Sequence, residues 1–482
     1  MENRNIRNLS LLTDYYQINM IYAHYKKGIR KKEVVFDVFF RENPCKSGYA
    51  IFAGLEQVID YLKMLKLTKE DLEYLASVYP YDQDFLEFME GFRFTGQLWS
   101  VEEGTVVFPY EPIIKIQTNL LEAHLLETAI LNIINHQVLL ATKASRIVNA
   151  ANGDPVLEFG LRRAQGPDAG IYGARATYIG GAAGTSNVLA GKLFGIPIMG
   201  THAHAFIQSY PSELEAFITF AEAFIDNAVL LVDTYDTLHS GVPNAIKTFT
   251  LMKEKYGDKF TNFGIRLDSG DLAYLSKNAR KMLDDAGFST AKIVASNDLD
   301  EHLIRDLKLQ GAKINVWGVG TNLITSADCP ALGGVYKMAA EKTAEGFIPK
   351  IKISENPEKI TTPGNKQLVR FYDATTNRAK LDLVMLADED VPTTDFIAFD
   401  PVNIWKRKLV KNYYTKELLV PIFSDGQLVY QSPSLTEMRN KAKEELNTIA
   451  DEIQRLKNPH IYHVDLSKKL WDLKYQLVHH ER

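Results

Sequence analysis

Two imidazoles and a hydroxyl follow a short apolar run near the middle of the chain. The run 195–199 has the length and composition of a buried strand, and the motif Gly200-Thr201-His202-Ala203-His204 comes directly after it. An extended backbone would place both histidines on one face. Spacing alone leaves three interpretations open: satisfied polar residues, half of a metal site, or a catalytic imidazole. A zinc site needs at least a third protein ligand, and no further His/Cys cluster occurs nearby in the sequence.

Small, charged or imidazole residues follow each of six apolar runs in this part of the chain. The runs are residues 156–159, 196–199, 229–232, 263–267, 292–295 and 314–317, with helical patterns between them. Such alternation predicts parallel β/α units, in an open sheet or a closed barrel. Sites in these folds are built from the carboxyl ends of the strands. The segments that follow the other five runs are Gly160-Leu161-Arg162-Arg163, Asp233-Thr234-Tyr235-Asp236, Asp268-Ser269-Gly270-Asp271, Ser296-Asn297-Asp298 and Gly318-Val319-Gly320-Thr321.

The residue types in these segments suit a phosphorylated sugar. Backbone amides at Gly320 and the Thr321 hydroxyl favour an anion, and Ser296-Asn297 adds small donors at the preceding strand end. Arg266, with Asp268 and Asp271, is a candidate for ribose hydroxyls and Mg²⁺; the alternative is a helix N-cap with acids in its first turn. Arg162 and Arg163 either bind a carboxylate or phosphate, or form a solvated surface pair.

The composition is that of a soluble globular protein with two or three domains in 482 residues. The net charge of −5 argues against nucleic-acid binding by bulk electrostatics. Cys45 and Cys329 are the only cysteines, which excludes a disulfide framework and fits a reducing cytosol. The N-terminus lacks a signal-peptide pattern, and no apolar run approaches the roughly 20 residues of a membrane span. We therefore expect a cytoplasmic protein with no membrane partner.

The flanking regions predict further domains. Residues 1–118 have an α+β pattern, with helices expected at 11–25, 54–65 and 69–79 and strands at 33–40, 106–108 and 113–117. Residues 119–345 open with one long helix or two abutting helices at 120–149 and continue into the β/α region. Residues 346–482 predict strands at 351–353, 368–372 and 381–385 and a charged helix from Ser434 to residue 456.

Several motifs together resemble the nicotinate phosphoribosyltransferases over residues 11–370. The motifs are Leu12-Thr13-Asp14-Tyr15-Tyr16-Gln17, Glu158-Phe159-Gly160-Leu161-Arg162-Arg163-Ala164-Gln165-Gly166, Tyr178-Ile179-Gly180-Gly181, Gly184-Thr185-Ser186-Asn187-Val188-Leu189-Ala190-Gly191, Gly200-Thr201-His202-Ala203-His204, Arg266-Leu267-Asp268-Ser269-Gly270-Asp271 and Gly333-Gly334-Val335-Tyr336-Lys337.

The resemblance implies an α/β fold, with an irregular TIM-like β/α barrel packed on the α+β domain. The C-terminal strands and helices are expected to pack back on the N-terminal domain. The implied reaction joins nicotinate to 5-phosphoribosyl 1-diphosphate (PRPP), giving nicotinate mononucleotide and diphosphate in NAD biosynthesis. ATP hydrolysis is coupled to it through a phosphohistidine, and Mg²⁺ accompanies PRPP and ATP without fixed protein ligands. The implied assembly is a homodimer with shared active sites.

The same resemblance assigns roles to residues of this chain. The His of Gly-Thr-x-Ala-His falls on His204, so this residue would be the phosphohistidine, acting with Arg266 and Asp268. Tyr16 and Phe159 would enclose the pyridine ring. Arg162, Ser186, Thr201 and Asp271 would contact the substrates. Phosphate and diphosphate would bind Arg41, Ser296, Asn297, Gly320, Thr321, Lys359 and Lys366.

Two other functions stay open. The nicotinamide phosphoribosyltransferases have the same fold, but an aspartate stands there where this chain has Ser186. A barrel that binds a phosphorylated ligand without turnover is the second alternative. The presence of His204, Arg266 and Asp268 together argues against this non-catalytic function.

Overall fold

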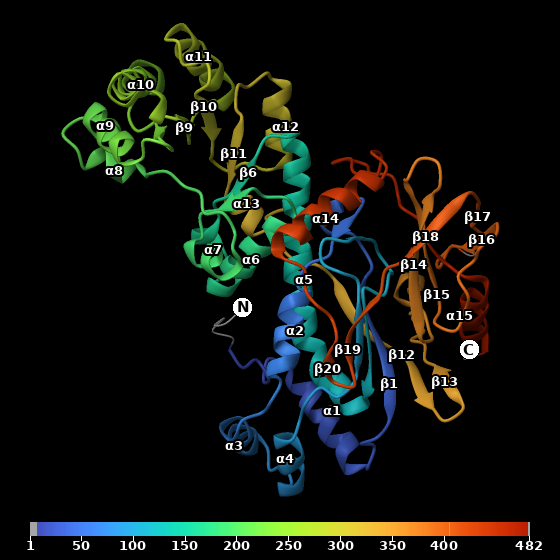
Figure 1. Cartoon of the computed structure of the whole chain (residues 1–482). Helices are drawn as coiled ribbons and strands as arrows, with labels where there is room; N and C mark the ends of the chain where they lie inside the picture. The colour runs from blue at the N-terminus through green and yellow to red at the C-terminus, as the bar shows by residue number, and fades with distance from the viewer. Residues whose placement is uncertain (1–6, 404, 481–482) are drawn as a thin grey trace. The chain divides into compact units, whose positions relative to one another are not determined.

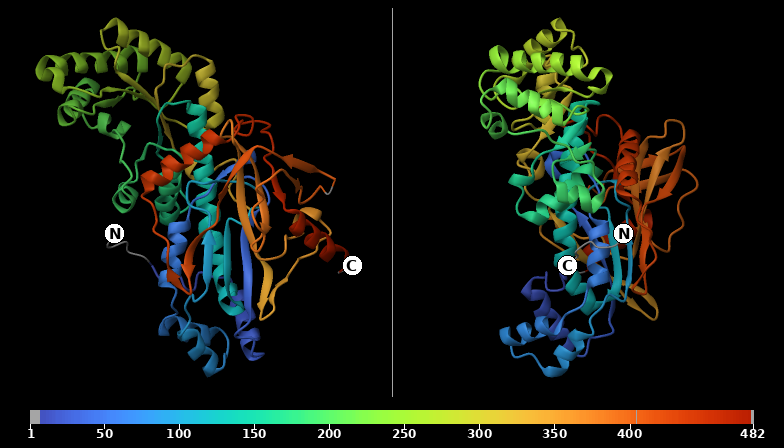
Figure 2. Two further views of the ribbon diagram at one scale, coloured as in Figure 1. Left: turned by 45° about the vertical axis from the view of Figure 1, so that its right-hand side comes forward. Right: turned by 60° about the vertical axis from the view of Figure 1, so that its left-hand side comes forward.

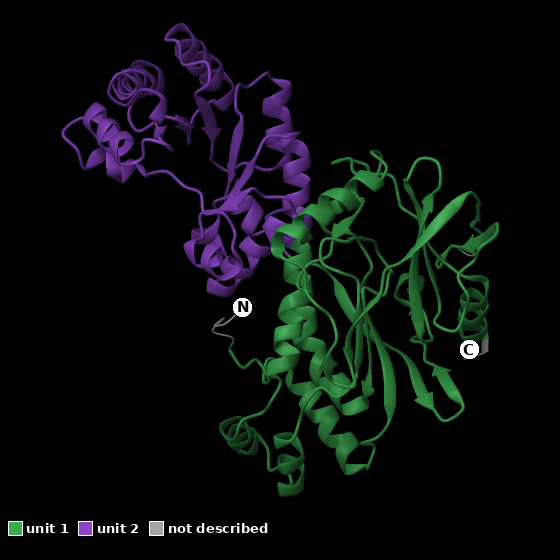
Figure 3. Cartoon of the chain, in the orientation of Figure 1, with its two compact units in different colours: residues 1–139, 331–482 green, residues 140–330 purple. Residues whose placement is uncertain are grey.

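The computed structural model describes residues 7–403 and 405–480 (Figure 1). It divides into two compact units, which Figure 3 colours separately. Unit 1 comprises Met1–Leu139 and Ala331–Arg482, and unit 2 comprises Leu140–Pro330. The sequence analysis placed the domain boundaries at 118/119 and 345/346, whereas the units meet at 139/140 and 330/331. The N-terminal and C-terminal segments thus share one unit, and the β/α segment is inserted between them.

The main sheet of unit 1 has seven strands in the order β13-β12-β1-β5-β3-β19-β20. Strand β1 pairs antiparallel with β12 and β5 and is buried along most of its length, as its β-branched and aromatic sequence predicts. The strands are β1 Glu33–Phe40, β3 Gln97–Ser100, β5 Ile114–Asn119, β12 Gly334–Thr343, β13 Gly346–Pro349, β19 Val420–Ser424 and β20 Gln427–Leu428; β2 Ala50–Ile51 and β4 Val106–Val107 form a separate pair.

The N-terminal helices of unit 1 agree with the predicted ones to within a few residues. They are α1 Tyr15–Lys26, α2 Leu55–Met64 and α3 Lys69–Val78, and the pattern missed α4 Gln83–Glu90. Helix α3 begins where it does because Thr68 and Asp71 form a reciprocal capping box. Helix α1 begins at Tyr15 because its N-cap residue Asp14 has an extended backbone.

Residues 120–151 form one helix, α5 (Leu120–Ala151), which is continuous in all views (Figures 1 and 2). The absence of Gly and Pro from this segment explains why it does not break in two. It is the one described helix that is long and apolar enough to cross a membrane, and 67% of its most apolar window is buried inside the protein. The core helix of a soluble protein has the same properties.

A second sheet of unit 1 is built from the C-terminal segment, in the order β17-β16-β21-β15-β14-β18. Its core includes Phe371, Leu381 and Leu383, which are fully buried. The strands are β14 Lys366–Asp373, β15 Ala379–Leu386, β16 Phe396–Phe399, β17 Arg407–Val410, β18 Tyr413–Glu417 and β21 Val464–Leu466; the helices are α14 Leu435–Thr448 and α15 Lys468–His480.

The C-terminal predictions need two corrections. The run 351–353 is not a strand, because the Lys352 amide donates to the Thr361 side chain at 2.9 Å instead of joining a β-ladder. Helix α14 begins after its N-cap Ser434, where the sequence predicts the start, and Ser434 forms a capping box with Glu437. It ends at Thr448 and not at residue 456. The sequence pattern also missed helix α15.

Unit 2 is built on a six-stranded parallel sheet in the order β7-β6-β11-β10-β9-β8. Strands β7 and β8 are its two edges, so the sheet is an open half-barrel. The strands are β6 Val156–Glu158, β7 Gly184–Thr185, β8 Val229–Leu231, β9 Gly264–Leu267, β10 Lys292–Ala295 and β11 Val316–Val319; the helices are α6 Pro167–Ile179, α7 Val188–Phe194, α8 His204–Gln208, α9 Glu213–Ala223, α10 Val242–Tyr256, α11 Leu272–Asp285, α12 Glu301–Leu309 and α13 Thr321–Ile324.

One predicted strand of unit 2 is wrong. Residues 196–199 make only an isolated bridge, between Ile198 and Thr185, and the edge strand of the sheet is β7. Pro197 lacks a backbone N–H, so this run cannot form a regular ladder through its middle. The remaining five strands occur where the sequence predicts them, although β11 is shifted two residues toward the C-terminus and includes Gly318 and Val319.

Candidate active site

Polar side chains gather at the carboxyl edge of the half-barrel. Because the six strands are parallel, their C-terminal ends all meet at this edge. Hydrogen bonds link the ends of neighbouring strands: the Asp268 amide donates to Asp233 Oδ2 at 2.8 Å, and the Ser296 hydroxyl donates to Asp268 Oδ1. The loops after the strands therefore form one connected polar surface in unit 2.

His204 lies at this edge, at the first residue of helix α8. Its Nδ1 is 3.1 Å from Thr234 Oγ1, and its Nε2 is 3.8 Å from Asp268 Oδ2. The side chain is 41% exposed, so a ligand can reach the ring. When Nδ1–H donates to Thr234, the lone pair is on Nε2, which is the nitrogen that faces the carboxylate.

His202 lies in a different environment. The ring is buried, and its centroid lies 5.4 Å from that of Phe206 and 4.6 Å from that of Phe220. Its Nε2 accepts a hydrogen bond from the Leu231 amide at 3.3 Å. Burial lowers the pKa of His202 to about 4, so the imidazole is neutral at pH 7. The loop does not continue as a strand, and the two histidines do not share a face.

Asp233 and Thr234 form hydrogen bonds at the carboxyl edge, although the sequence analysis gave neither residue a role. Asp233 Oδ2 accepts from the Asp268 amide and from the Ser269 hydroxyl, at 2.8 and 2.6 Å. Asp233 Oδ1 is buried without a hydrogen-bond partner among the described residues. The signal that could have identified both residues is their place directly after a buried strand, the same signal that selects Asp268.

Arg266 projects from β9 toward the loop that carries the histidines. Its guanidinium donates to Thr201 Oγ1 at 2.5 Å and to the His202 carbonyl at 3.3 Å. Burial lowers the pKa of Arg266, Asp268 raises it, and the nearby charge of Arg162 lowers it further. Arg266 is partly exposed and Arg162 is exposed, and two neighbouring guanidiniums would attract an anion.

Phe159 and Ser186 follow the adjacent strands β6 and β7. The Phe159 ring lies over Gly318 of β11, where a Cβ would come 2.7 Å from Phe159 Cδ2, so this strand position requires glycine. The Ser186 amide donates to the Glu158 carbonyl at 2.9 Å, which holds the second loop beside the first. Both side chains are partly exposed at the carboxyl edge.

The predicted phosphate loops follow β10 and β11. Ser296 is 6% exposed, whereas Asn297 and Asp298 have positive φ angles of 97° and 42°. A φ of 97° is strained for asparagine, and such strain clusters at functional sites. Gly320 and Thr321 begin the short helix α13.

Asp271 is the N-cap of helix α11 and accepts from the Tyr274 amide at 2.9 Å. This is the helix-capping role that the sequence analysis gave as the alternative to ribose binding.

The remaining predicted residues belong to unit 1. Tyr16 is 51% exposed on α1. Arg41 follows β1 and lies over the Phe39 ring, 5.7 Å from its centroid, and its Nε has no described hydrogen-bond partner. Lys359 is exposed. Lys366 is buried, and its Nζ contacts Asp37 Oδ2 at 2.7 Å and two backbone carbonyls at 2.8 Å each. All three N–H groups of Lys366 are thus engaged, so binding diphosphate would require it to exchange a partner.

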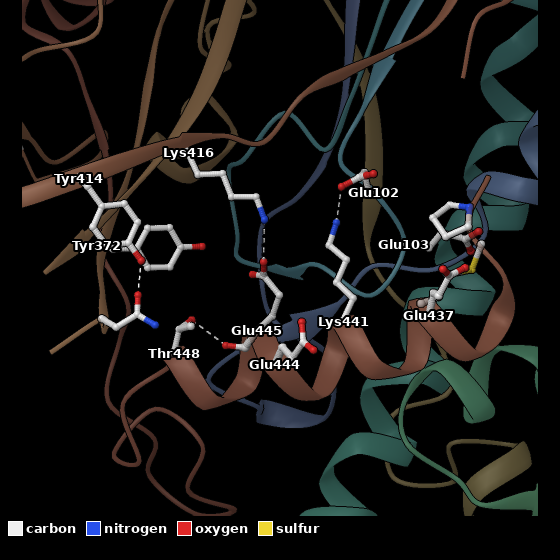
Figure 4. A pocket seen from close by; sticks show the side chains of 13 residues that line it. Glu102, Glu103, Tyr372, Tyr414, Lys416, Glu437, Lys441, Glu444, Glu445 and Thr448 are labelled. Carbon is white, nitrogen blue, oxygen red and sulfur yellow. Dashed lines mark hydrogen bonds and ion pairs between the residues drawn. The ribbon is translucent and has the colours of Figure 1, made fainter. Parts of the chain in front are cut away.

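A separate polar pocket of about 540 Å³ lies within unit 1, beside helix α14 (Figure 4). Its lysines are already paired: Lys441 contacts Glu102 at 2.6 Å and Lys416 contacts Glu445 at 3.3 Å. Tyr372 and Tyr414 stack along another part of its wall. The pocket contains none of the predicted site residues. Among the described residues, no group of three or more His, Cys, Asp or Glu side chains is arranged to hold a metal ion.

Comparison with known proteins covers nearly the whole chain. Three family models match: the nicotinate phosphoribosyltransferase N-terminal domain over residues 11–135, the nicotinate phosphoribosyltransferase family over 155–373 and the corresponding C-terminal domain over 365–474. A nicotinate phosphoribosyltransferase of Bacillus subtilis is 49% identical over 472 residues, which are 98% of this chain and 95% of that protein. The human relative of the same name is 32% identical over 522 residues, with 95% of each chain covered.

Solved structures agree with the sequence matches. The crystal structure of human nicotinic acid phosphoribosyltransferase matches with a TM-score of 0.84 and 30% identity, over 97% of this chain and 99% of that one.

Proposed function

The chain belongs to the nicotinate phosphoribosyltransferase family, and we propose that it joins nicotinate to PRPP in NAD biosynthesis, with ATP hydrolysis coupled to the transfer. The observation that carries this proposal is the position of His204. Its Nε2 faces Asp268 at 3.8 Å on the carboxyl edge of a parallel sheet, between loops suited to a pyridine ring and to phosphate.

Nicotinate would bind between the loops after β6 and β7. The Phe159 ring offers a face for the pyridine, and the neutral Ser186 hydroxyl can donate to the carboxylate. Arg266 and Arg162 supply positive charge nearby, since Arg162 is close enough for its charge to lower the pKa of Arg266. Tyr16 would cover the other face of the ring.

In the transfer step the pyridine nitrogen attacks C1 of the phosphoribosyl group as the bond from C1 to the diphosphate oxygen breaks. Positive charge develops on the ribose, and a carboxylate beside it stabilises that charge. Asp268 has this role in our proposal, with Asp271 at the ribose hydroxyls. Arg41 and Lys359 would hold the leaving diphosphate, and the 5-phosphate would lie against Ser296, Asn297, Gly320 and Thr321.

ATP is coupled through His204. Nε2 attacks the γ-phosphorus, the bond to the β–γ bridging oxygen breaks, and ADP leaves. When Nδ1–H donates to Thr234 Oγ1, this hydrogen bond holds the tautomer that keeps the Nε2 lone pair free. The phosphoryl group adds negative charge that can order neighbouring loops before water removes it as inorganic phosphate.

The carboxylates at the edge fit a magnesium ion that enters with PRPP or ATP. Asp233 Oδ1 is buried without a described partner, while the other oxygen of this carboxylate accepts from the Asp268 amide. Magnesium is usually held by one or two carboxylates together with substrate phosphates. The substrate phosphates would hold the ion, as the resemblance implies, with Asp233 and Asp268 beside it, and the ion would neutralise phosphate charge.

We further propose a cytoplasmic homodimer in which each active site takes Tyr16 and Arg41 from the partner subunit.

One assay tests this function. The purified protein is incubated with nicotinate, PRPP and Mg²⁺, with and without ATP, and nicotinate mononucleotide, diphosphate and ADP are quantified. We expect mononucleotide and diphosphate in equal amounts and faster turnover with ATP. The absence of mononucleotide under all conditions would refute the proposal. The His204→Ala variant, prepared in parallel, should lose the acceleration by ATP.

A further inference from the structure

A buried carboxylate lies directly behind the two loops that carry Phe159 and Ser186. Glu158 ends strand β6 and is 1% exposed. Its Oε1 accepts from the Gly160 amide, and its Oε2 accepts from the Thr185 hydroxyl at 2.6 Å. Burial raises the pKa of Glu158, while these two hydrogen bonds lower it. The carboxylate therefore joins the end of β6 to the end of β7.

Thr185 extends this connection into the second loop. It is 1% exposed, and its hydroxyl oxygen accepts from the Asn187 amide at 3.0 Å while donating to Glu158. The Asn187 side chain in turn caps helix α7 by accepting from the Ala190 amide at 3.1 Å. Ser186 is thus held on both sides, at Thr185 and at Asn187.

The backbone of the same loops is tied in parallel. The Ser186 amide donates to the Glu158 carbonyl at 2.9 Å, and the Phe159 amide donates to the Val319 carbonyl at 2.8 Å. The hydrogen bonds of the Glu158 carboxylate add a second restraint, because they hold Gly160 and Thr185 from the buried side of the loops. A polar network with all its members satisfied is rigid.

We propose that Glu158 and Thr185 are positioning residues for nicotinate, which set the separation between the Phe159 ring and the Ser186 hydroxyl. This inference rests on the proposed function, since it concerns the base of that reaction. Neither residue needs to touch substrate: both are buried, and both act through the loops they hold. Their loss should weaken nicotinate binding while His204 phosphorylation, which does not involve the base, continues.

The test compares two buried threonines of unit 2. Thr185→Val removes the hydroxyl and keeps the shape, whereas Thr185→Ser restores the hydroxyl. Thr177→Val is the matched control, because Thr177 is fully buried in α6 and its hydroxyl donates only to the Ala174 carbonyl, at 3.0 Å. Glu158→Gln tests the other partner, since an amide keeps only one acceptor oxygen. For each variant, the KM for nicotinate, the KM for PRPP, the melting temperature and the ATP-dependent phosphorylation of His204 are measured.

For Thr185→Val we expect a roughly tenfold rise in the KM for nicotinate, while the KM for PRPP and His204 phosphorylation stay within about twofold of the wild type. Thr185→Ser should recover most of the affinity. Glu158→Gln combined with Thr185→Val should cost less than the product of the two single effects, because both act on one contact.

The inference is wrong if Thr185→Val behaves as Thr177→Val does, or if the KM values for nicotinate and PRPP rise in parallel. A wild-type protein that makes no mononucleotide would overturn the proposed function and this inference together. An active wild type with an unaffected Thr185→Val variant would overturn the positioning role alone.

Discussion

His204 presents Nε2 to the Asp268 carboxylate at 3.8 Å, while Thr234 holds Nδ1 of the same ring at 3.1 Å. This relationship distinguishes the two histidines of the motif. One ring is reachable and oriented by a hydroxyl, and the other is enclosed by phenylalanines.

The first prediction concerns the phosphoryl acceptor. With γ-labelled ATP, His204→Ala should carry no acid-labile phosphate and should lose ATP hydrolysis linked to PRPP, because the nucleophilic nitrogen is gone. His202→Gln should still be labelled, because the buried His202 ring does not face the edge. Normal labelling stoichiometry of the His204→Ala protein would show that the phosphate is elsewhere.

The second prediction concerns the choice of base. The neutral Ser186 hydroxyl favours a carboxylate, so we expect kcat/KM for nicotinate to exceed that for nicotinamide by at least about a hundredfold, roughly 3 kcal/mol. Ser186→Asp should reduce or reverse this preference, because two carboxylates in a poorly hydrated site repel each other. Ser186→Ala separates the loss of a donor from added repulsion. Comparable kcat/KM values for both bases in the wild type would contradict the prediction.

The third prediction concerns sharing of the active site between subunits. Tyr16 is half exposed on α1, as expected of a side chain that serves a partner. Homodimers of Tyr16→Ala and of His204→Ala should each be nearly inactive in ATP-driven turnover. Heterodimers formed by subunit exchange should contain one intact site and recover activity toward half of the wild-type value. If mass measurements confirm exchange while activity stays at the level of the parents, Tyr16 acts within its own chain.

The fourth prediction concerns stability at low pH. Burial lowers the pKa of His202 from 6.5 to about 4, so the unfolded chain binds a proton at this residue more readily than the folded chain does. The stability contributed by neutral His202 is complete above pH 6.5 and is lost as the pH falls toward 4. From pH 7 to pH 5 this one residue should reduce the free energy of unfolding by about 2 kcal/mol.

Urea unfolding of the wild type and of His202→Gln at the two pH values checks this prediction. The difference in stability between pH 7 and pH 5 should be smaller by about 2 kcal/mol in the variant, which has no titrating group at this position. An equal pH dependence in both proteins would contradict it. Other buried histidines such as His124, whose pKa is also lowered to about 4, contribute equally to both proteins.

Local sequence patterns were sufficient for most of the elements. The β-branched run of β1 matches its predicted bounds, and β10 does as well. The parallel half-barrel also follows from apolar runs that alternate with helical patterns. The edge strand was misplaced because the apolar composition of residues 196–199 outweighed Pro197, whose missing N–H prevents a ladder. The two-residue strand β7 is too short to leave a pattern.

For the candidate site, too, the sequence predicts one part and the tertiary structure is needed for the rest. Residue types at the strand ends point to a phosphorylated sugar, because the carboxyl ends of parallel strands must meet at one edge. The roles of Asp233, Thr234, Glu158 and Thr185 depend on hydrogen bonds between strands that are adjacent in the sheet, and the order β7-β6-β11-β10-β9-β8 is not the order of the chain. Spacing treated His202 and His204 alike. The motif resemblance selected His204, but the physical difference between the two rings comes from the tertiary structure, because burial among aromatic rings and contact with Thr234 and Asp268 arise from segments far away in the sequence.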